Sequence, residues 1–245
     1  MNRNSLSVTT SLIIVNIVVF LVGLVARQPS ILGLPVPGAD QTEPTLQIMG
    51  AYSWFTCFKE WELWRLISYQ FLHANFGHIL FNMWALFFFG PAVEQMMGPR
   101  RFLAYYLGCG VAGALFSSIL AGLGIFSMID SPQAVLEVNT LVHQFTDYTG
   151  TVQPWELVPL IGASAAVYGV MVSVAFMFPD VRISLLFPPV TMTMRTFALV
   201  IIGFATVTIL LNLDNAGGEA GHLGGIILGS IVMLIWKWRS GGYFR

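Results

Sequence analysis

Four polar side chains that stand in apolar surroundings are of the types that a hydrolytic site needs. Ser164 lies in IGASAAVYG and His222 in AGHLGG, while His78 and Asn82 are four residues apart in HANFGHILFN. A serine hydroxyl is a weak nucleophile until a base removes its proton, and an imidazole can be that base. The oxyanion formed on attack needs donors, which the serine N–H, the asparagine amide and the second imidazole can supply. The set predicts nucleophilic hydrolysis.

The stretch around Ser164 also has a structural interpretation. Gly162 and Ala166, and likewise Ala165 and Gly169, are small residues four apart, a spacing that lets transmembrane helices approach closely. The stretch resembles the serine elbow G-x-S-x-G only loosely, because Ala166 stands where the second glycine belongs. The two interpretations are compatible, since a close approach would bring the serine within reach of a histidine on a neighbouring helix.

The composition identifies the solvent around these side chains. Hydrophobic residues make up 56% of the 245 residues and charged residues only 9%, whereas a soluble protein is about 25% charged. The chain is therefore predicted to be a polytopic membrane protein. The absence of a basic run argues against a nucleic-acid partner. Cys57 and Cys109 fall in a predicted loop and a predicted membrane helix, so they are not expected to pair.

Six apolar segments are long enough to cross a bilayer, since about 20 helical residues suffice. They are residues 9–26, 73–90, 101–126, 157–178, 196–213 and 220–238. The first has no clear cleavage site, so it is expected to be a retained span. Two long connections, 27–72 and 127–156, are expected outside the hydrocarbon. The predicted fold class is all-α, with six transmembrane helices in one domain over residues 1–245.

The basic residues are distributed unevenly across the predicted membrane. With the N-terminus inside, the inner side carries Arg3, Arg100, Arg101, Arg182, Arg195, Lys237, Arg239 and Arg245. The outer side carries only Arg27, Lys59 and Arg65. Because basic residues favour the cytoplasmic side, both termini are predicted to be cytoplasmic. Most carboxylates, Glu219 among them, fall on the outer side.

This topology places the polar side chains at similar depth in the outer leaflet. Ser164 would lie about two turns below the outer end of the fourth span, and His222 would open the sixth. His73, His78 and Asn82 would lie in the first half of the second span. No carboxylate is expected at that depth, so a Ser–His dyad is predicted rather than a Ser–His–Asp triad. Water must reach the site through a cavity open to the outer face.

Five motifs together resemble those of the rhomboid family of intramembrane serine proteases. They are WR at Trp64 and Arg65, HANFGHILFN from His73 to Asn82, EQMMG from Glu94 to Gly98, GASAAVYG with Gly162, Ser164 and Tyr168, and GHLGGIILG with His222, Gly225 and Gly229. The resemblance covers the first span and nearly everything from about residue 60 onward.

The resemblance implies a serine endopeptidase that cleaves transmembrane proteins near the outer face of the membrane. It implies a catalytic dyad of Ser164 and His222, with Tyr168 stacked on the histidine. It also implies an oxyanion hole formed by His78, Asn82 and the Ser164 N–H. No metal and no cofactor are expected, and the partners would be transmembrane substrates and the lipid bilayer.

The resemblance also concerns the surroundings of this site. Trp64 and Arg65 would belong to a structural loop partly submerged in the bilayer, and the helix at 196–213 with the outer loops would control substrate entry. The family usually has glycine after the serine, where this chain has Ala165. Its methyl could crowd the oxyanion hole or simply replace one small residue by another, and activity is expected to survive. The connection at 127–156, longer than usual for the family, could cap the site, bind a partner or do neither. The compact six-span plan without organelle-targeting features indicates a bacterial plasma membrane.

Three other functions fit parts of the pattern. Ala165 would suit a silent rhomboid-like protein that binds transmembrane clients, although silent members commonly lose the serine or the histidine. A transporter would need polar groups that continue toward the inner face, but VMVSVAFMF and MWALFFFG, beyond the serine and the asparagine, offer only Ser173. A zinc protease is disfavoured because His73 and His78 lack the H-E-x-x-H spacing.

Overall fold

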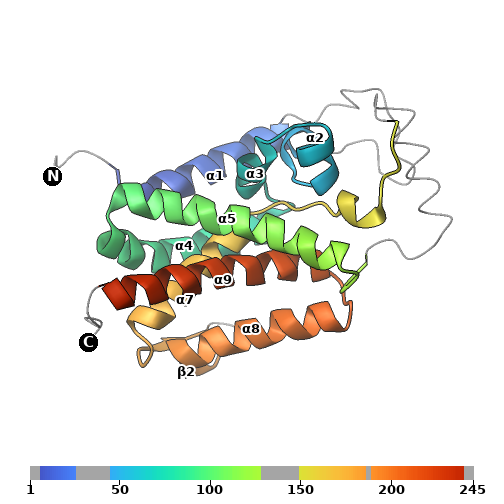
Figure 1. Cartoon of the computed structure of the whole chain (residues 1–245). Coiled ribbons are helices and arrows are strands. Elements are labelled where there is room, and N and C mark those ends of the chain that lie inside the picture. The colour runs from blue at the N-terminus through green and yellow to red at the C-terminus, as the bar shows by residue number, and fades with distance from the viewer. Residues whose placement is uncertain (1–5, 26–44, 128–148, 186–188, 240–245) are drawn as a thin grey trace.

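The described part of the protein is a bundle of helices with a short antiparallel pair of strands. The computed structural model describes residues 6–25, 45–127, 149–185 and 189–239. Its long helices are α1 (Val8–Val25), α4 (Phe76–Met97), α5 (Pro99–Gly122), α7 (Ser164–Met177), α8 (Met194–Leu210) and α9 (Ala216–Arg239). Each of them overlaps one of the six apolar segments predicted from the sequence. Helix α1 begins, and helix α9 ends, at the same end of the bundle (Figure 1).

Within the described residues, four helices are long and apolar enough to cross a membrane: α1, α4, α5 and α9. Helix α7 has 14 residues and α8 has 17. At about 1.5 Å per residue, α7 covers about 21 Å of a hydrocarbon core about 30 Å thick. The outer surface of the bundle carries exposed apolar side chains such as Val18, Phe81 and Leu234. A surface of this kind suits lipid as the surrounding solvent.

The fourth predicted span, residues 157–178, is wrong at its N-terminal end, because helix α7 begins only at Ser164. Upstream, Leu160 forms two backbone hydrogen bonds with Tyr52, of 2.8 and 3.0 Å, instead of helical ones. Gly162 has a φ of +122°, far from the helical region, and its N–H donates to the Tyr69 carbonyl oxygen at 2.9 Å. Ser164 is therefore the first helical residue, not one two turns inside.

Two further helix boundaries differ from the prediction. His73 precedes α4, which begins at Phe76 after Asn75, whose side chain accepts a hydrogen bond from a backbone N–H of the first turn. Helix α9 begins at Ala216, so His222 lies about two turns inside it rather than at its start. Hydropathy locates apolar runs, whereas these boundaries depend on caps and on small residues that pack inside the bundle.

Helix α9 packs against α5, α7 and α8, and glycines set its distance from them. A Cβ at Gly225 would collide with the backbone of Ala165 in α7, and one at Gly229 would lie 3.0 Å from the Gly169 carbonyl oxygen. On the side of α5, a Cβ at Gly224 would lie 2.7 Å from the Ala112 carbonyl oxygen. Small residues thus allow backbone-to-backbone contact between the central helices.

Helix α1 is attached to the corner between α4 and α5. Glu94 accepts hydrogen bonds from the backbone N–H groups of Val8 and Thr9, both at 2.8 Å, and from the Thr9 hydroxyl at 2.7 Å. A carboxylate at the start of a helix satisfies its unpaired N–H groups and its positive dipole end. Gly98, with a φ of +79°, then turns the chain into α5. The predicted Glu94–Gly98 motif therefore lies at a helix junction.

Short helical turns occupy the described part of the segment between α1 and α4. They are α2 (Thr45–Gly50), η1 (Phe55–Lys59), α3 (Arg65–Ser68) and η2 (Tyr69–Phe71), and a similar turn, η3 (Pro154–Leu157), precedes α7. The rest of the two predicted connections, 26–44 and 128–148, lies outside the described residues. The expected cap or partner site on the second connection therefore stays a prediction.

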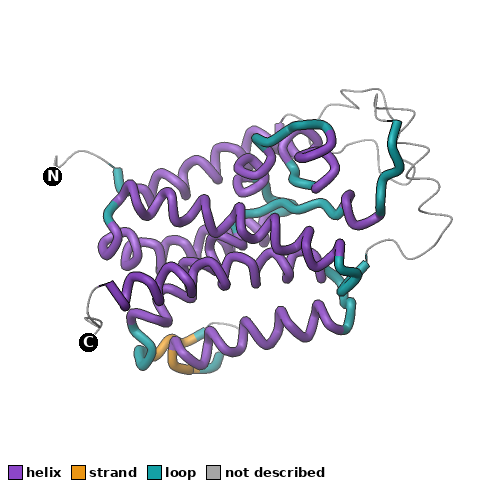
Figure 2. Tube along the Cα trace, viewed as in Figure 1, coloured by secondary structure: helices purple, strands orange, loops and turns teal. Residues whose placement is uncertain are grey.

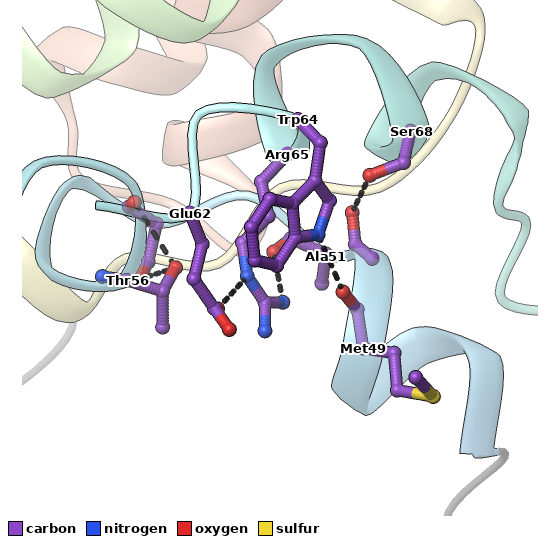
Figure 3. Close-up of polar contacts among 9 residues, drawn as sticks. Met49, Ala51, Thr56, Glu62, Trp64, Arg65 and Ser68 are labelled. Carbon is purple, nitrogen blue, oxygen red and sulfur yellow. Dashed lines mark hydrogen bonds and ion pairs between the residues drawn. The ribbon is translucent and has the colours of Figure 1, made fainter. Parts of the chain in front are cut away.

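The Trp64–Arg65 pair ties these turns together (Figure 3). The Arg65 side chain, 9% exposed, pairs with Glu62 and donates to the Ala51 carbonyl oxygen at 2.8 Å. The Trp64 indole donates to the Met49 carbonyl oxygen at 3.3 Å, yet the residue is 56% exposed. A buried guanidinium that fastens backbone and an outward indole suit a structured loop at a membrane interface.

The prediction of an all-α chain misses one small element. Strands β1 (Arg182–Ser184) and β2 (Thr191–Thr193) form an antiparallel pair between α7 and α8, drawn in orange in Figure 2. The β-branched Ile183, Thr191 and Thr193 favour extended backbone, and three residues per strand are too few for a hydropathy pattern to reveal.

Candidate active site

Ser164 and His222 lie in contact between helices α7 and α9. The Ser164 Oγ is 2.7 Å from the His222 Nε2, although 58 residues separate them in the chain. As the first residue of α7, Ser164 has a backbone N–H with no intrahelical acceptor. The positive end of the helix dipole lies at the same point and favours negative charge. The geometry suits proton transfer to the imidazole and stabilisation of an anion beside the serine.

Tyr168 and Glu219 contact the imidazole of His222 from its face and its edge. The ring of Tyr168 stacks on it, with centroids 4.1 Å apart and an interplanar angle of 13°. The Glu219 Oε2 is 2.9 Å from the His222 Nδ1, and the two residues are only 6% and 9% exposed. The prediction that no carboxylate lies at this depth is therefore wrong. Helix α9 begins before the predicted span, which places Glu219 one turn ahead of His222 on the same face.

His78 and Asn82 approach this pair from α4. The Asn82 Nδ2 donates to the His78 carbonyl oxygen at 2.9 Å, which leaves its second N–H for another acceptor. The His78 Nδ1 accepts from the Ala74 N–H at 3.4 Å, so the proton of a neutral ring sits on Nε2. A Cβ built at Gly162 would lie 2.7 Å from the His78 Nε2 and 3.6 Å from the Ser164 Oγ. Glycine at this position thus keeps the space between donor and nucleophile open.

His73 supports His78 from behind. The two rings meet edge to face, with centroids 4.9 Å apart, and His73 borders a separate hollow of about 330 Å³ between α1, α2 and the start of α4. Loss of hydration, together with the neighbouring His78, lowers the pKa of His73 to about 3. The ring is therefore neutral near neutral pH. In the described part of the chain, no three His, Cys, Asp or Glu side chains gather in a way that could hold a metal ion.

A cavity of about 770 Å³ connects these groups. Its polar lining includes His78, Asn82, Ser164, Tyr168 and His222, and its apolar lining includes Phe81, Met171, Phe197 and Ile201. Helices α4, α7, α8 and α9 all contribute to it. A few convergent polar groups within apolar walls are typical of a binding or active site.

Ala165 points away from the cavity. A Cβ built at Gly113 in α5 would lie only 2.5 Å from the Ala165 Cβ, and Ala165 is 4% exposed. The added methyl therefore fills space against α5 and leaves the oxyanion side free. Gly169 likewise serves packing, since a Cβ there would lie 2.6 Å from the Cys109 Sγ. The stretch around the serine thus combines packing residues with one glycine, Gly162, that borders the site.

Sequence reasoning missed Glu219 as a neighbour of the imidazole. The signal was present as Glu-x-x-His, because residues three apart on a helix share a face. Gly113 was also missed, since the contact that makes it necessary comes from a different helix.

Comparison with known proteins identifies the family. The model of the rhomboid domain matches residues 60–239, so the chain belongs to the rhomboid family. Together with the apolar helices, this makes it an integral membrane protein. The predicted membership of the rhomboid family is thereby confirmed.

The relatives include both named proteases and a named inactive protein. Rhomboid protease AarA of Providencia stuartii is 24% identical over 94% of this chain and 72% of its own length. Rhomboid protease GluP of Bacillus subtilis is 27% identical over 80% of this chain and 30% of its own. Inactive RHOMBOID-like protein 8 of Arabidopsis thaliana is 32% identical over 42% of this chain and 32% of its own. The chain thus spans about a third of the last two proteins.

Proposed function

We propose that this protein is an intramembrane serine endopeptidase with Ser164 as nucleophile and His222 as base. The observation that carries the proposal is the 2.7 Å contact between the Ser164 Oγ and the His222 Nε2, on the wall of a cavity shared with His78 and Asn82. Membership of the rhomboid family supports intramembrane proteolysis as the reaction class. Residues 1–245 would form one rhomboid domain.

The reaction follows from the positions of these groups. Ser164 Oγ attacks the carbonyl carbon of the scissile peptide bond while His222 Nε2 takes the hydroxyl proton. The oxyanion accepts hydrogen bonds from the Ser164 N–H, the Asn82 amide and the His78 Nε2–H. His222 then gives its proton to the departing amine, which leaves an ester on the serine. A water molecule, deprotonated by His222, hydrolyses the ester, and the proton returns to the serine oxygen.

The substrates would be transmembrane proteins, cleaved near the outer face of the membrane. The apolar walls that α4 and α8 contribute to the cavity suit a hydrophobic segment, and α8 with its adjoining loops would control its entry. Eight basic residues fall on the predicted inner side and three on the outer side, which supports a cytoplasmic location for both termini. A bacterial plasma membrane is the location that we propose.

A second candidate is binding of transmembrane clients without cleavage. One relative is named inactive, and the family therefore contains both kinds of protein. Against this candidate stand the Ser164–His222 contact and the Ala165 methyl, which packs against α5 and not into the cavity. Cleavage remains the better supported function.

Labelling with a fluorophosphonate probe tests the proposal. We expect the detergent-solubilised wild type to be labelled and to cleave a model transmembrane substrate. Ser164→Ala and His222→Ala should lose both properties, whereas Ser184→Ala, on the exposed hairpin, should keep both. A folded wild type that is neither labelled nor cleaves would overturn the proposal and favour client binding.

A further inference from the structure

The carboxylate of Glu219 lies where a third member of a catalytic triad would lie. Its Oε2 is 2.9 Å from the His222 Nδ1, and the opposite ring nitrogen, Nε2, is 2.7 Å from the Ser164 Oγ. Carboxylate, imidazole and hydroxyl therefore form one continuous line of hydrogen bonds. Glu219 and His222 are both buried, so bulk water does not compete for the contact between the carboxylate and Nδ1.

The carboxylate decides which ring nitrogen carries the proton. An ionised carboxylate can only accept hydrogen bonds, so the His222 Nδ1 must be the donor in their contact. The Nε2 of a neutral ring then has a free lone pair, and it faces the Ser164 hydroxyl. Without the carboxylate, the two tautomers would compete, and the one protonated at Nε2 cannot take the proton of the serine.

Glu219 is also placed to compensate the charge that develops during the reaction. When the Ser164 proton moves to Nε2, His222 becomes an imidazolium, and its Nδ1–H points at the carboxylate. The attraction between opposite charges at this distance is larger in a buried site than in water. No proton needs to pass to Glu219, because the imidazolium delivers its proton to the leaving amine through Nε2.

We propose that Glu219 is a positioning residue that completes a Ser164–His222–Glu219 triad. The inference rests on the proposed endopeptidase function and deepens it, since a Ser–His dyad alone would leave the imidazole without an acidic partner. Tyr168 would hold the plane of the ring and Glu219 its rotation and tautomer.

A purely structural role for Glu219 makes a different prediction. Glu219 lies in the first turn of α9, where a carboxylate stabilises the helix through its dipole. In that case its replacement would lower thermal stability and change the amount of active protein, but not the tautomer of His222. Asp214, which is exposed just ahead of α9, offers a control for the loss of one negative charge near this helix end.

The test compares the wild type with Glu219→Gln, Glu219→Asp and Asp214→Asn in proteoliposomes. We expect Glu219→Gln to lower kcat at least about 100-fold with KM nearly unchanged, because a triad amide permits the wrong tautomer. Glu219→Asp should recover part of the loss, and Asp214→Asn should match the wild type. Nitrogen-15 NMR of labelled histidine, assigned with His222→Ala, should show His222 protonated at Nδ1 in the wild type.

Two results would overturn the inference. One is a folded Glu219→Gln protein with the kcat of the wild type, and the other is a wild-type His222 protonated at Nε2. The NMR measurement needs no substituted Glu219, so it decides the question even where Glu219→Gln does not fold. An active wild type in either case leaves the endopeptidase function standing, whereas a wild type that neither cleaves nor reacts with the probe refutes that function itself.

Discussion

Replacing Gly225 by alanine is expected to disable the site without changing any of its side chains. A Cβ at Gly225 would collide with the Ala165 carbonyl oxygen, and it would lie 2.7 Å from the carbonyl carbon and 3.3 Å from the Cα of the same residue. Carbon atoms pack at about 3.5–4.0 Å, so the backbones of α7 and α9 must separate by about 1 Å. Ser164 is the neighbour of Ala165, and His222 lies one turn before Gly225, so the displacement acts directly on their contact.

The expected loss of cleavage rate follows from the increase in the distance between Ser164 and His222. The distance between the Ser164 Oγ and the His222 Nε2 would grow from 2.7 Å to about 3.7 Å, beyond hydrogen-bond reach. A misplacement of about 1 Å costs about 100-fold in rate. Overpacking of the helix interface would also lower the free energy of unfolding by about 1–3 kcal/mol.

The assay is cleavage of a model transmembrane substrate in proteoliposomes, together with thermal unfolding. Gly203→Ala in α8 is the matched control, since a Cβ there has no atom within 4 Å. It should keep the wild-type kcat and stability. A folded Gly225→Ala protein with the wild-type kcat would refute the reasoning, and so would an equal loss in Gly203→Ala.

Two further predictions concern His73 and the Gly113–Ala165 contact. The pKa of His73 is lowered to about 3 by burial, against about 6.5 in an unfolded chain, so the unfolded state binds more protons between these values. The free energy of unfolding should therefore not depend on His73 above about pH 6.5, and it should decrease as the pH drops from there toward 3. His73→Gln should flatten this dependence in pH-resolved thermal unfolding, and an unchanged slope would contradict the assignment. Gly113→Ala should destabilise by about 1–3 kcal/mol, because its Cβ would lie 2.5 Å from the Ala165 Cβ and 2.6 Å from the Gly221 carbonyl oxygen. Ala165→Gly in the same chain should recover part of that loss, and a double-mutant cycle without coupling would show that the two residues do not meet.

Errors in the prediction have a common physical origin. Hydropathy sums the character of side chains over a window, and it does not register backbone dihedral angles or hydrogen-bond partners. Residues 157–163 are apolar enough to extend the fourth span, yet the pairing of Leu160 with Tyr52 and the positive φ of Gly162 exclude a helix there. Conversely, the start of α9 is poor in hydropathy but helical, and the prediction therefore placed Glu219 outside the helix.

The sequence by itself determined the solvent of this protein, the apolar segments that became its long helices, and the chemistry available to it. The first two properties depend on residue types along each segment. The chemistry depends on residue types and spacing in the motifs around Ser164, His222 and His78. Tertiary structure alone decided which atoms meet. Close contact of α7 with α9 brings the serine oxygen to Nε2 of the imidazole, and packing of α7 on α5 sets the methyl of Ala165 against α5 rather than into the cavity. Contacts between helices depend on their separation and rotation, which packing at glycines sets and which no single segment encodes.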